Sequence, residues 1–160
     1  MDSLLPIAAR VGALLKERKE TLCISESSAG GLISAALLAV PGASAYFLGG
    51  AVVYTREART ELLGISRQAL ADVPPSTEAY ALVLARGTRA RLNTTWALSE
   101  IGATGPTGNR YGFAAGHACF AVAGPVERSV TLETGNGDRI GNMRRFGVGA
   151  LELLEAALKG

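Results

Sequence analysis

The sequence predicts one α/β domain, a three-layer α/β/α sandwich in which helices cover both faces of a mixed, mostly parallel sheet. Apolar residues at helical spacing alternate with short apolar runs that are typical of buried strands. Two runs late in the chain meet at Gly124-Pro125 and indicate a hairpin, so one strand should run antiparallel. A length of 160 residues, 48% of them hydrophobic, fits a single domain over residues 1–160.

The first half of the chain alternates between helix and strand. Apolar spacing predicts an amphipathic helix over 4–15, and the short apolar run 21–25 reads as a buried strand. The stretch 32–40 is apolar on nearly every side, which suits a helix buried between layers. Residues 48–55 predict a central strand, and a charged helix should follow over 56–63.

The second half continues the alternation and then adds the hairpin. A helix is expected over 76–92, where Ser-Thr-Glu is a plausible helix start. A strand is expected over 95–100. The hairpin strands should occupy 116–123 and 126–133, and apolar spacing over 146–158 predicts a closing amphipathic helix. This order supports the mixed sheet.

Composition excludes several classes of protein. The net charge of +2 gives no indication of nucleic-acid binding. No apolar stretch approaches the ~18 residues of a membrane span, and the first residues lack the features of a signal peptide, so a cytoplasmic protein without a membrane partner is expected. Cys23 and Cys119 read as buried thiols. With His117 as the one histidine, no metal site is expected.

A glycine-rich turn after the first predicted strand is a candidate ligand site. In the run 26–31, Glu-Ser-Ser-Ala-Gly-Gly, the glycines Gly30 and Gly31 would let an anion approach the start of the next helix. The alternative is an ordinary capped turn. Because a carboxylate repels phosphate, Glu26 is expected to bind a hydroxyl group, orient a partner or accept a proton.

Three further segments carry possible chemistry. Ser44 lies between small residues in a turn and is a candidate nucleophile, or else it caps a short helical turn. The long glycine-rich loop 101–115 is of a length that is usually functional or mobile. Arg139 is expected in the first turn of a helix, where the helix dipole favours acidic residues. A bound phosphate would explain an arginine at this position; the alternative is an exposed surface arginine.

Together these motifs resemble the CinA C-terminal domain family, the nicotinamide-nucleotide amidases among the competence/damage-inducible proteins. Residues 26–31 are similar to the family's ESCTGG, and 42–54 to its GSSxxFxGGxVxY block. Residues 102–106 are similar to GIAGP, and 137–139 to the GDR that precedes the final helix. The four blocks occur in family order over almost the whole chain.

The resemblance implies a homo-oligomer that hydrolyses nicotinamide mononucleotide (NMN) to nicotinate mononucleotide and ammonia, without a cofactor. It implies Ser44 as the nucleophile, with Tyr54 and Arg59 as orienting or charge-stabilising groups. It also implies a set of substrate-binding residues: Glu26, Ser27, Gly30, Gly31, Gly102, Thr104 and Arg139. Among these, Gly30, Gly31 and Arg139 would contact the phosphate.

The chain departs from the family pattern next to the strand tyrosine. The family reads roughly NEAK there, and its lysine is thought to be the base for the serine, whereas residues 56–59 read Arg-Glu-Ala-Arg. Arginine stays protonated with a pKa above ~12, so Arg59 is a poor base. A family threonine is also replaced by Ile101. We therefore expect weak or absent NMN deamidation, and an increase on Arg59→Lys.

Two alternatives to an NMN amidase follow from the same residues. One is a catalytically inactive relative that binds a nucleotide. The other is an amidohydrolase with a different substrate, in which Glu26, Glu100 or His117 supplies the base.

Overall fold

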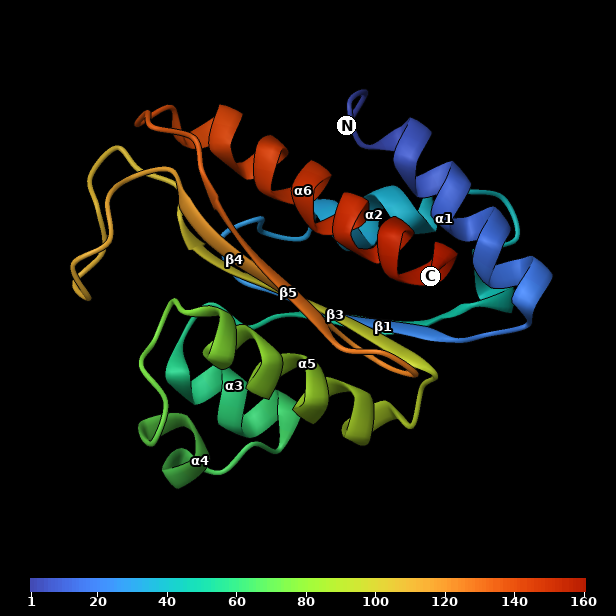
Figure 1. Cartoon of the computed structure of the whole chain (residues 1–160), viewed down its shortest axis with the longest axis horizontal. Coiled ribbons are helices and arrows are strands. Elements are labelled where there is room, and N and C mark those ends of the chain that lie inside the picture. Colours follow the sequence, from blue (N-terminus) through green and yellow to red (C-terminus); the bar gives the residue numbers. More distant parts are fainter.

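The computed structural model describes residues 1–160, and its centre is a five-stranded mixed sheet (Figure 1). From one edge to the other the strands are β2 (Phe47–Val52), β1 (Leu22–Glu26), β3 (Trp96–Ala103), β4 (His117–Ala123) and β5 (Arg128–Glu133). Strand β1 pairs in parallel with β2 and β3, while β4 is antiparallel to β3 and β5. The mixed sheet is confirmed, although half of its pairs, rather than most, are parallel.

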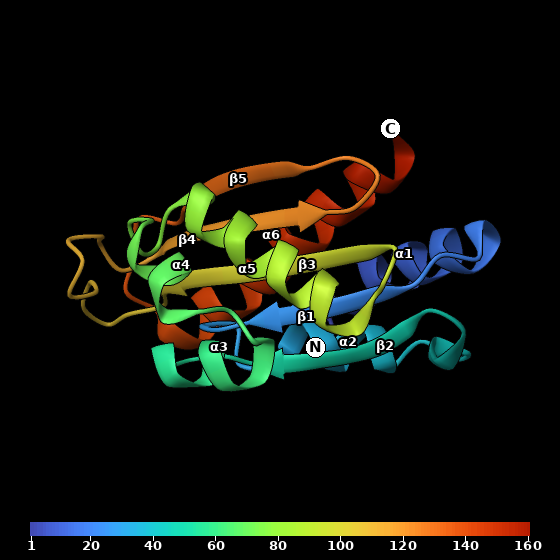
Figure 2. The same ribbon diagram turned by 90° about the horizontal axis from the view of Figure 1, so that it is seen from below.

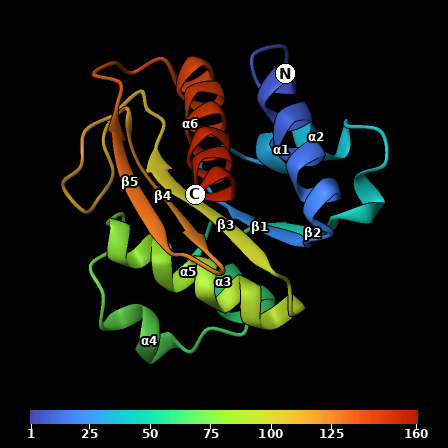
Figure 3. The same cartoon turned by 45° about the vertical axis from the view of Figure 1, so that its right-hand side comes forward.

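Helices pack on both faces of the sheet, as Figures 1 and 3 show. One face carries α1 (Leu5–Arg18), α2 (Leu32–Leu38) and α6 (Arg139–Lys159), and the other carries α3 (Arg56–Leu63), α4 (Arg67–Ala71) and α5 (Glu78–Leu92). Alternating strand side chains feed two apolar clusters, one beneath each set of helices. None of the helices combines the length and the hydrophobicity that a membrane-spanning helix requires.

Local sequence explains where several helices begin and end. The side chains of Thr55, Thr77 and Asp138 accept hydrogen bonds from the first turns of α3, α5 and α6. Helix α1 ends at Arg18, and the next residue, Lys19, adopts a left-handed conformation in which its backbone N–H donates to the carbonyls of Leu15 and Lys16. These caps account for boundaries that apolar spacing alone does not predict.

The structure differs from the predicted elements at four places. Strand β2 lies at the edge of the sheet rather than at its centre. The prediction was wrong because the apolar composition of β2 is like that of a strand with two neighbours. The closing helix begins at Arg139 rather than at 146, because Asp138 caps an additional polar turn. Helix α4 was not predicted, and β3 extends to Ala103, which shortens the expected loop.

Candidate functional site

The carboxyl ends of β1, β2 and β3 meet at one end of the sheet, which Figure 2 shows on the left. The chain runs from β1 to β2 on one side and returns to β3 on the other, so β1 and β3 flank a topological switch point, where α/β proteins bind ligands. A pocket of about 550 Å³ opens here. Its lining comes from the strand ends and two loops: Ser27, Tyr54, Thr55, Arg56, Glu57, Arg59, Ser76, Ile101, Gly102, Asn109, Arg110 and Tyr111.

Arg59 is the buried cation of this pocket, with 5% of its surface exposed. Its guanidinium donates to the carbonyl of Val53 (3.0 Å), the hydroxyl of Tyr80 (3.1 Å) and the carbonyl of Tyr54 (3.3 Å). It also lies 5.4 Å from the centre of the Tyr80 ring. No carboxylate forms an ion pair with it. Three of the five N–H donors are therefore engaged and two remain for a ligand.

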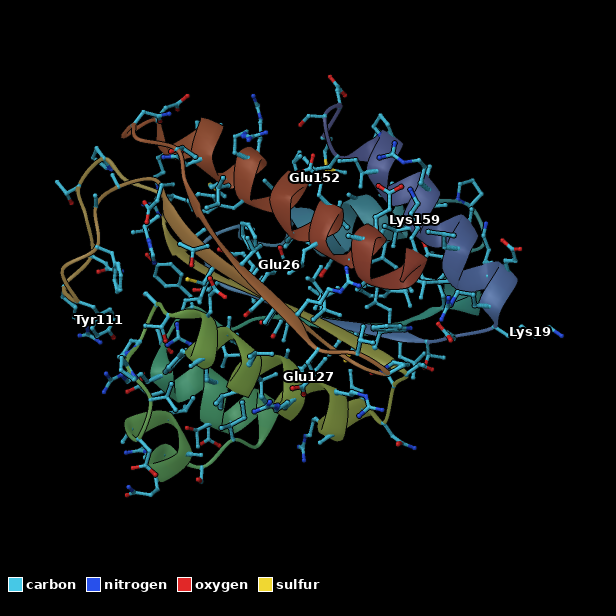
Figure 4. All side chains as sticks on the ribbon, viewed as in Figure 1. Lys19, Glu26, Tyr111, Glu127, Glu152 and Lys159 are labelled. Carbon is cyan, nitrogen blue, oxygen red and sulfur yellow. The ribbon has the colours of Figure 1, made fainter.

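The rim of the pocket is also basic. Arg56 and Arg110 lie over the ring of Tyr111, 5.8 and 5.2 Å from its centre, and Arg110 donates to the Tyr111 hydroxyl at 3.0 Å. Burial raises the pKa of Tyr111, but the hydrogen bond from Arg110 and the charges of both arginines outweigh it and lower that pKa overall. Tyr111 projects on the loop between β3 and β4 (Figure 4). With Glu57 as its one carboxylate, the lining carries a net positive charge that favours an anion.

The turn after β1 is held by the buried carboxylate of Glu100 on β3. Glu100 accepts from the backbone N–H groups of Ser27 (2.8 Å) and Ala29 (2.9 Å) and from the hydroxyl of Ser28. Burial raises the pKa of Glu100, and these donors act against that shift. The hydroxyl of Ser27 makes no hydrogen bond within the chain, so it is free to contact a ligand in the pocket.

The carboxylate of Glu26 caps helix α2 and is fully buried. It accepts from the backbone N–H groups of Gly31 (2.9 Å), Ile33 (3.1 Å) and Ser34 (3.0 Å), and from the Ser34 hydroxyl (2.7 Å). These are the donors that a helix start leaves unpaired. Glu26 therefore occupies the place that an anion would take at this helix.

His117 connects the sheet to the loop that precedes α5. Its Nε2 lies 2.8 Å from the carbonyl oxygen of Ser76, and its Nδ1 lies 2.5 Å from a carboxylate oxygen of Glu133. Each ring nitrogen therefore has a hydrogen-bond partner within the chain. The amide of Asn109 in turn donates to the Ser76 hydroxyl at 3.1 Å. Two loops of the pocket are thereby held together.

Comparison with known proteins identifies the family of this chain. The model of the CinA C-terminal domain matches residues 4–158, which is nearly the whole chain. The chain belongs to the CinA C-terminal domain family. This confirms the resemblance that the four sequence blocks indicated.

Curated relatives in this family are longer than the chain. A CinA-like protein of Cyanothece sp. is 40% identical over 120 residues, covering 75% of this chain and 29% of that protein. One from Desulfosudis oleivorans is 37% identical over 160 residues, covering 98% of this chain and 38% of that protein. The chain thus spans about a third of the length of the curated relatives that it matches.

Solved structures of the CinA superfamily share the fold. A competence-damaged protein (CinA) superfamily protein from Klebsiella pneumoniae is 25% identical with a TM-score of 0.90, covering 98% of both chains. The competence/damage-inducible protein of Agrobacterium tumefaciens is 26% identical with a TM-score of 0.89, covering 99% of this chain and 96% of that one. The fold described above is therefore that of the CinA superfamily.

The structure separates Ser44 from the two residues expected beside it. Tyr54 and Arg59 line the pocket at the carboxyl end of β2. Ser44 is exposed in the 3₁₀ turn η1 (Ala43–Ala45), which precedes the amino end of β2. Strand β2 alone spans about 20 Å at ~3.3 Å per residue. Within one chain, the predicted convergence of Ser44 with the pocket is wrong, because a strand carries its two flanking turns to opposite ends of the sheet.

The other CinA motifs lie at varying distances from the pocket. Ser27 and Gly102 line it, and a side chain at Gly102 would come within 2.6 Å of the His117 carbonyl oxygen. Gly30 and Gly31 are outside the lining, beside the helix start that Glu26 already caps. No free helix terminus is therefore left there for the expected phosphate.

The last two predicted residues belong to the start of α6. The guanidinium of Arg139 donates to the carbonyl of Gly105 at 2.7 Å, and Thr104 is buried with its carbonyl bonded to Asn142 (2.9 Å). Neither lines the pocket. Both support the loop that leaves β3.

Sequence reasoning missed the arginine and tyrosine of the β3–β4 loop, Arg110 and Tyr111, and also Ser76 and Asn109. A cationic and an aromatic residue side by side in a long glycine-rich loop was the available signal. No group of three His, Cys, Asp or Glu side chains is gathered closely enough to ligate a metal ion.

Proposed function

We propose that the pocket binds a phosphorylated mononucleotide and hydrolyses, slowly, the carboxamide of NMN to give nicotinate mononucleotide and ammonia. The family resemblance supports this substrate class, and the volume of about 550 Å³ is in the range of small-molecule sites. The observation that carries the proposal is the buried guanidinium of Arg59, which has no carboxylate partner and faces the pocket.

A buried charge is costly unless a counter-ion is present, and here a ligand can supply one. The exposed Arg56 and Arg110 suit a phosphate at the rim, which stays partly hydrated. Arg59 then faces the reacting end, where its two spare N–H groups can stabilise the oxyanion of a tetrahedral intermediate. Ser27 contributes a hydroxyl contact, and the exposed ring of Tyr54 suits the pyridinium ring.

Slow turnover is expected because Ser44 lies outside the pocket, so water must attack the carboxamide carbon, and no free base is present to take the proton of that water. The carboxylates of Glu26 and Glu100 already accept several hydrogen bonds each, and both nitrogens of His117 are engaged. The guanidinium of Arg59 stays protonated and repels the positive pyridinium ring of NMN. Both effects act against NMN hydrolysis, although a charged pocket still favours the phosphate.

The test is ammonia release from NMN and a panel of other carboxamides by the wild type and Arg59→Lys. A lysine at this position can lose its proton, because burial and the neighbouring arginines lower a lysine pKa. General-base catalysis contributes ~10²–10⁴-fold, so kcat should rise about tenfold or more. Arg144→Lys, an exposed arginine outside the pocket, should leave the rate unchanged. A fast wild type that slows on Arg59→Lys contradicts the proposal.

A binding protein without turnover is the second candidate, and the arginine at position 59 favours it. Titration calorimetry together with the ammonia assay distinguishes the two functions. A binding protein gives a calorimetric signal with NMN but releases no ammonia, and the Arg59→Lys variant releases none either. In both cases Arg59→Met should weaken NMN binding by about tenfold or more, since a hydrogen bond to a charged group is worth ~1.5–3 kcal/mol. Release of ammonia from another carboxamide alone would identify a different substrate.

A further inference from the structure

His117 is a buried residue beside the pocket to which the proposed function gives no role. It is the first residue of β4, and 3% of its surface is exposed. It pairs across the sheet with Glu133, the last residue of β5, whose carboxylate lies against its Nδ1. Because His117 does not line the pocket, its side chain can act on a ligand only through other residues.

The second ring nitrogen of His117 holds a strained residue of the pocket. Nε2 faces the carbonyl oxygen of Ser76, and because a carbonyl oxygen only accepts hydrogen bonds, Nε2 is the donor. Ser76 is buried and lines the pocket, and its φ of 59° lies in the left-handed region that favours glycine. Such a conformation persists only where its surroundings hold it. The support comes from His117 and from the thiol of Cys119, 3.4 Å from the same oxygen.

The face of the His117 imidazole holds the loop between β3 and β4. Phe113 stacks on it, with 4.0 Å between the ring centres and an angle of 15° between the ring planes. The turn that ends at Phe113 is closed by Asn109, whose side-chain oxygen accepts from the backbone N–H groups of Tyr111 (3.0 Å) and Phe113 (3.2 Å). Arg110 and Tyr111 lie inside this turn and line the pocket. The stacking therefore supports the segment that carries both side chains.

These contacts form a closed network of four residues. His117 contacts Ser76 and Phe113 directly. Asn109 is bonded to the same two residues, since its amide donates to the Ser76 hydroxyl at 3.1 Å and its side-chain oxygen accepts from the N–H of Phe113. A single contact would leave a loop free to pivot, whereas a closed network restrains both loops of the pocket from two directions. Removal of the His117 side chain opens this network.

We infer that His117 is a positioning residue, which fixes Arg110 at the rim of the pocket by holding Ser76 and Phe113. The inference rests on the proposed function, in which Arg110 faces the phosphate of the ligand. Charge-assisted hydrogen bonds to a phosphate require distances of about 2.7–2.9 Å, so a small displacement of the loop breaks them. This role differs from that of a general base, because both nitrogens of His117 already have partners within the chain.

The hold on the loop is tested first without a ligand, by hydrogen exchange of residues 109–113 followed by mass spectrometry. His117→Leu removes both the donor and the aromatic ring, so this segment should exchange about tenfold faster or more. The matched control is Phe120→Leu, because Phe120 is also buried on β4 but packs in the apolar cluster on the opposite face of the sheet. The control should leave the exchange of the loop unchanged. Equal rates in the wild type and His117→Leu overturn the inference.

A second variant separates the hydrogen bond from the stacking. The amide nitrogen of a glutamine can reach the place of Nε2, so His117→Gln can still donate to Ser76, although it has no ring to stack on Phe113. Its loop should exchange faster than that of the wild type and more slowly than that of His117→Leu. Circular dichroism checks that each variant folds, and the comparison of His117→Gln with the wild type stands even if His117→Leu does not fold. A His117→Gln loop that exchanges at the wild-type rate contradicts the role of the ring.

The effect on the ligand is tested by a double-mutant cycle with Arg110→Ala. By titration calorimetry, His117→Leu and Arg110→Ala should each weaken NMN binding about tenfold, because each removes the contact of Arg110 with the phosphate. In the Arg110→Ala background, His117→Leu should cause little further loss, since the residue through which it acts is already absent. A second full loss of about tenfold refutes positioning through Arg110. A wild type that does not bind NMN refutes the proposed function, whereas hydrogen exchange still decides whether His117 holds the loop.

Discussion

At the scale of single residues, the two buried glutamates have different partners and therefore different roles. Glu100 fixes the backbone of the pocket turn that contains Ser27, whereas Glu26 is fully used by the start of α2. Hydrogen bonds from backbone N–H groups to a buried carboxylate stabilise the fold more than the same bonds to a neutral acceptor would. Glu26 is therefore assigned a structural role next to the site rather than contact with the ligand.

This assignment predicts the effect of Glu26→Gln. The amide keeps one oxygen and turns an N–H group toward the helix start, so at least one donor there loses its acceptor. The free energy of unfolding should fall by about 1–3 kcal/mol, the cost of a buried unsatisfied donor. Urea unfolding measures the change, and Glu17→Gln, at an exposed position of α1, should have no effect. An unchanged midpoint for Glu26→Gln would contradict the role.

At the scale of elements, one carboxylate joins the two long helices of the same face. Glu155 on α6 accepts from Arg10 on α1 at 2.8 Å and from Lys159 at 2.7 Å. The hydrogen bonds from Arg10 and Lys159 lower the pKa of Glu155 to about 2. Its usual pKa is 4.5. The ionised form is therefore favoured by folding.

The sign of the pH dependence follows. The pKa is lower in the folded state, so the stabilisation is complete above about pH 4.5 and is lost as the pH falls toward 2. We expect Glu155→Gln to be less stable than the wild type at pH 7, by about 1 kcal/mol or less for a partly exposed pair. The difference should shrink between pH 4.5 and 2. Urea unfolding across this range checks it, and a constant difference would contradict the linkage.

At the scale of the whole molecule, a ligand that binds the folded pocket should stabilise the chain. At 100 times Kd the gain is ~2.7 kcal/mol, which corresponds to an increase in Tm of about 5–10 °C for a domain of this size. NMN should produce this shift and nicotinamide riboside, which lacks only the phosphate, should not. The shift should be lost in Arg59→Met. Equal shifts with both ligands would mean that the phosphate is not recognised.

The sequence predicted the alternation of elements because burial imposes a period of 3.6 residues on helices and of two on strands. It did not reveal that β2 is an edge strand, because residues 48–53 are as apolar as a central strand. The number of neighbours that a strand has depends on the tertiary structure. The hairpin strands were predicted because Gly124-Pro125 interrupts two apolar runs that are close in sequence.

The site was predictable only where strand ends contribute to it. Tyr54, Arg59 and Gly102 come at or after strands whose carboxyl ends meet at one end of the sheet. Arg110 and Tyr111 lie in a loop with no periodic pattern, so their position depends on how that loop folds back. To predict the position of Ser44, the direction of β2 in the sheet has to be considered. A motif that precedes a strand and a motif that follows it lie at opposite ends of the sheet.

The place of β1 between β2 and β3 has a consequence for synthesis on the ribosome. Strands β1 and β2 are complete once residue 52 has been made, but the second neighbour of β1 begins only at Trp96. Until then both sides of an apolar strand pair are unpaired, since pairing over so long a separation in sequence is slow. The nascent chain is therefore vulnerable to aggregation after β2 has left the ribosome and before β3 has done so. A pause in translation within that interval would lengthen the exposure, whereas a pause after β3 has emerged would not.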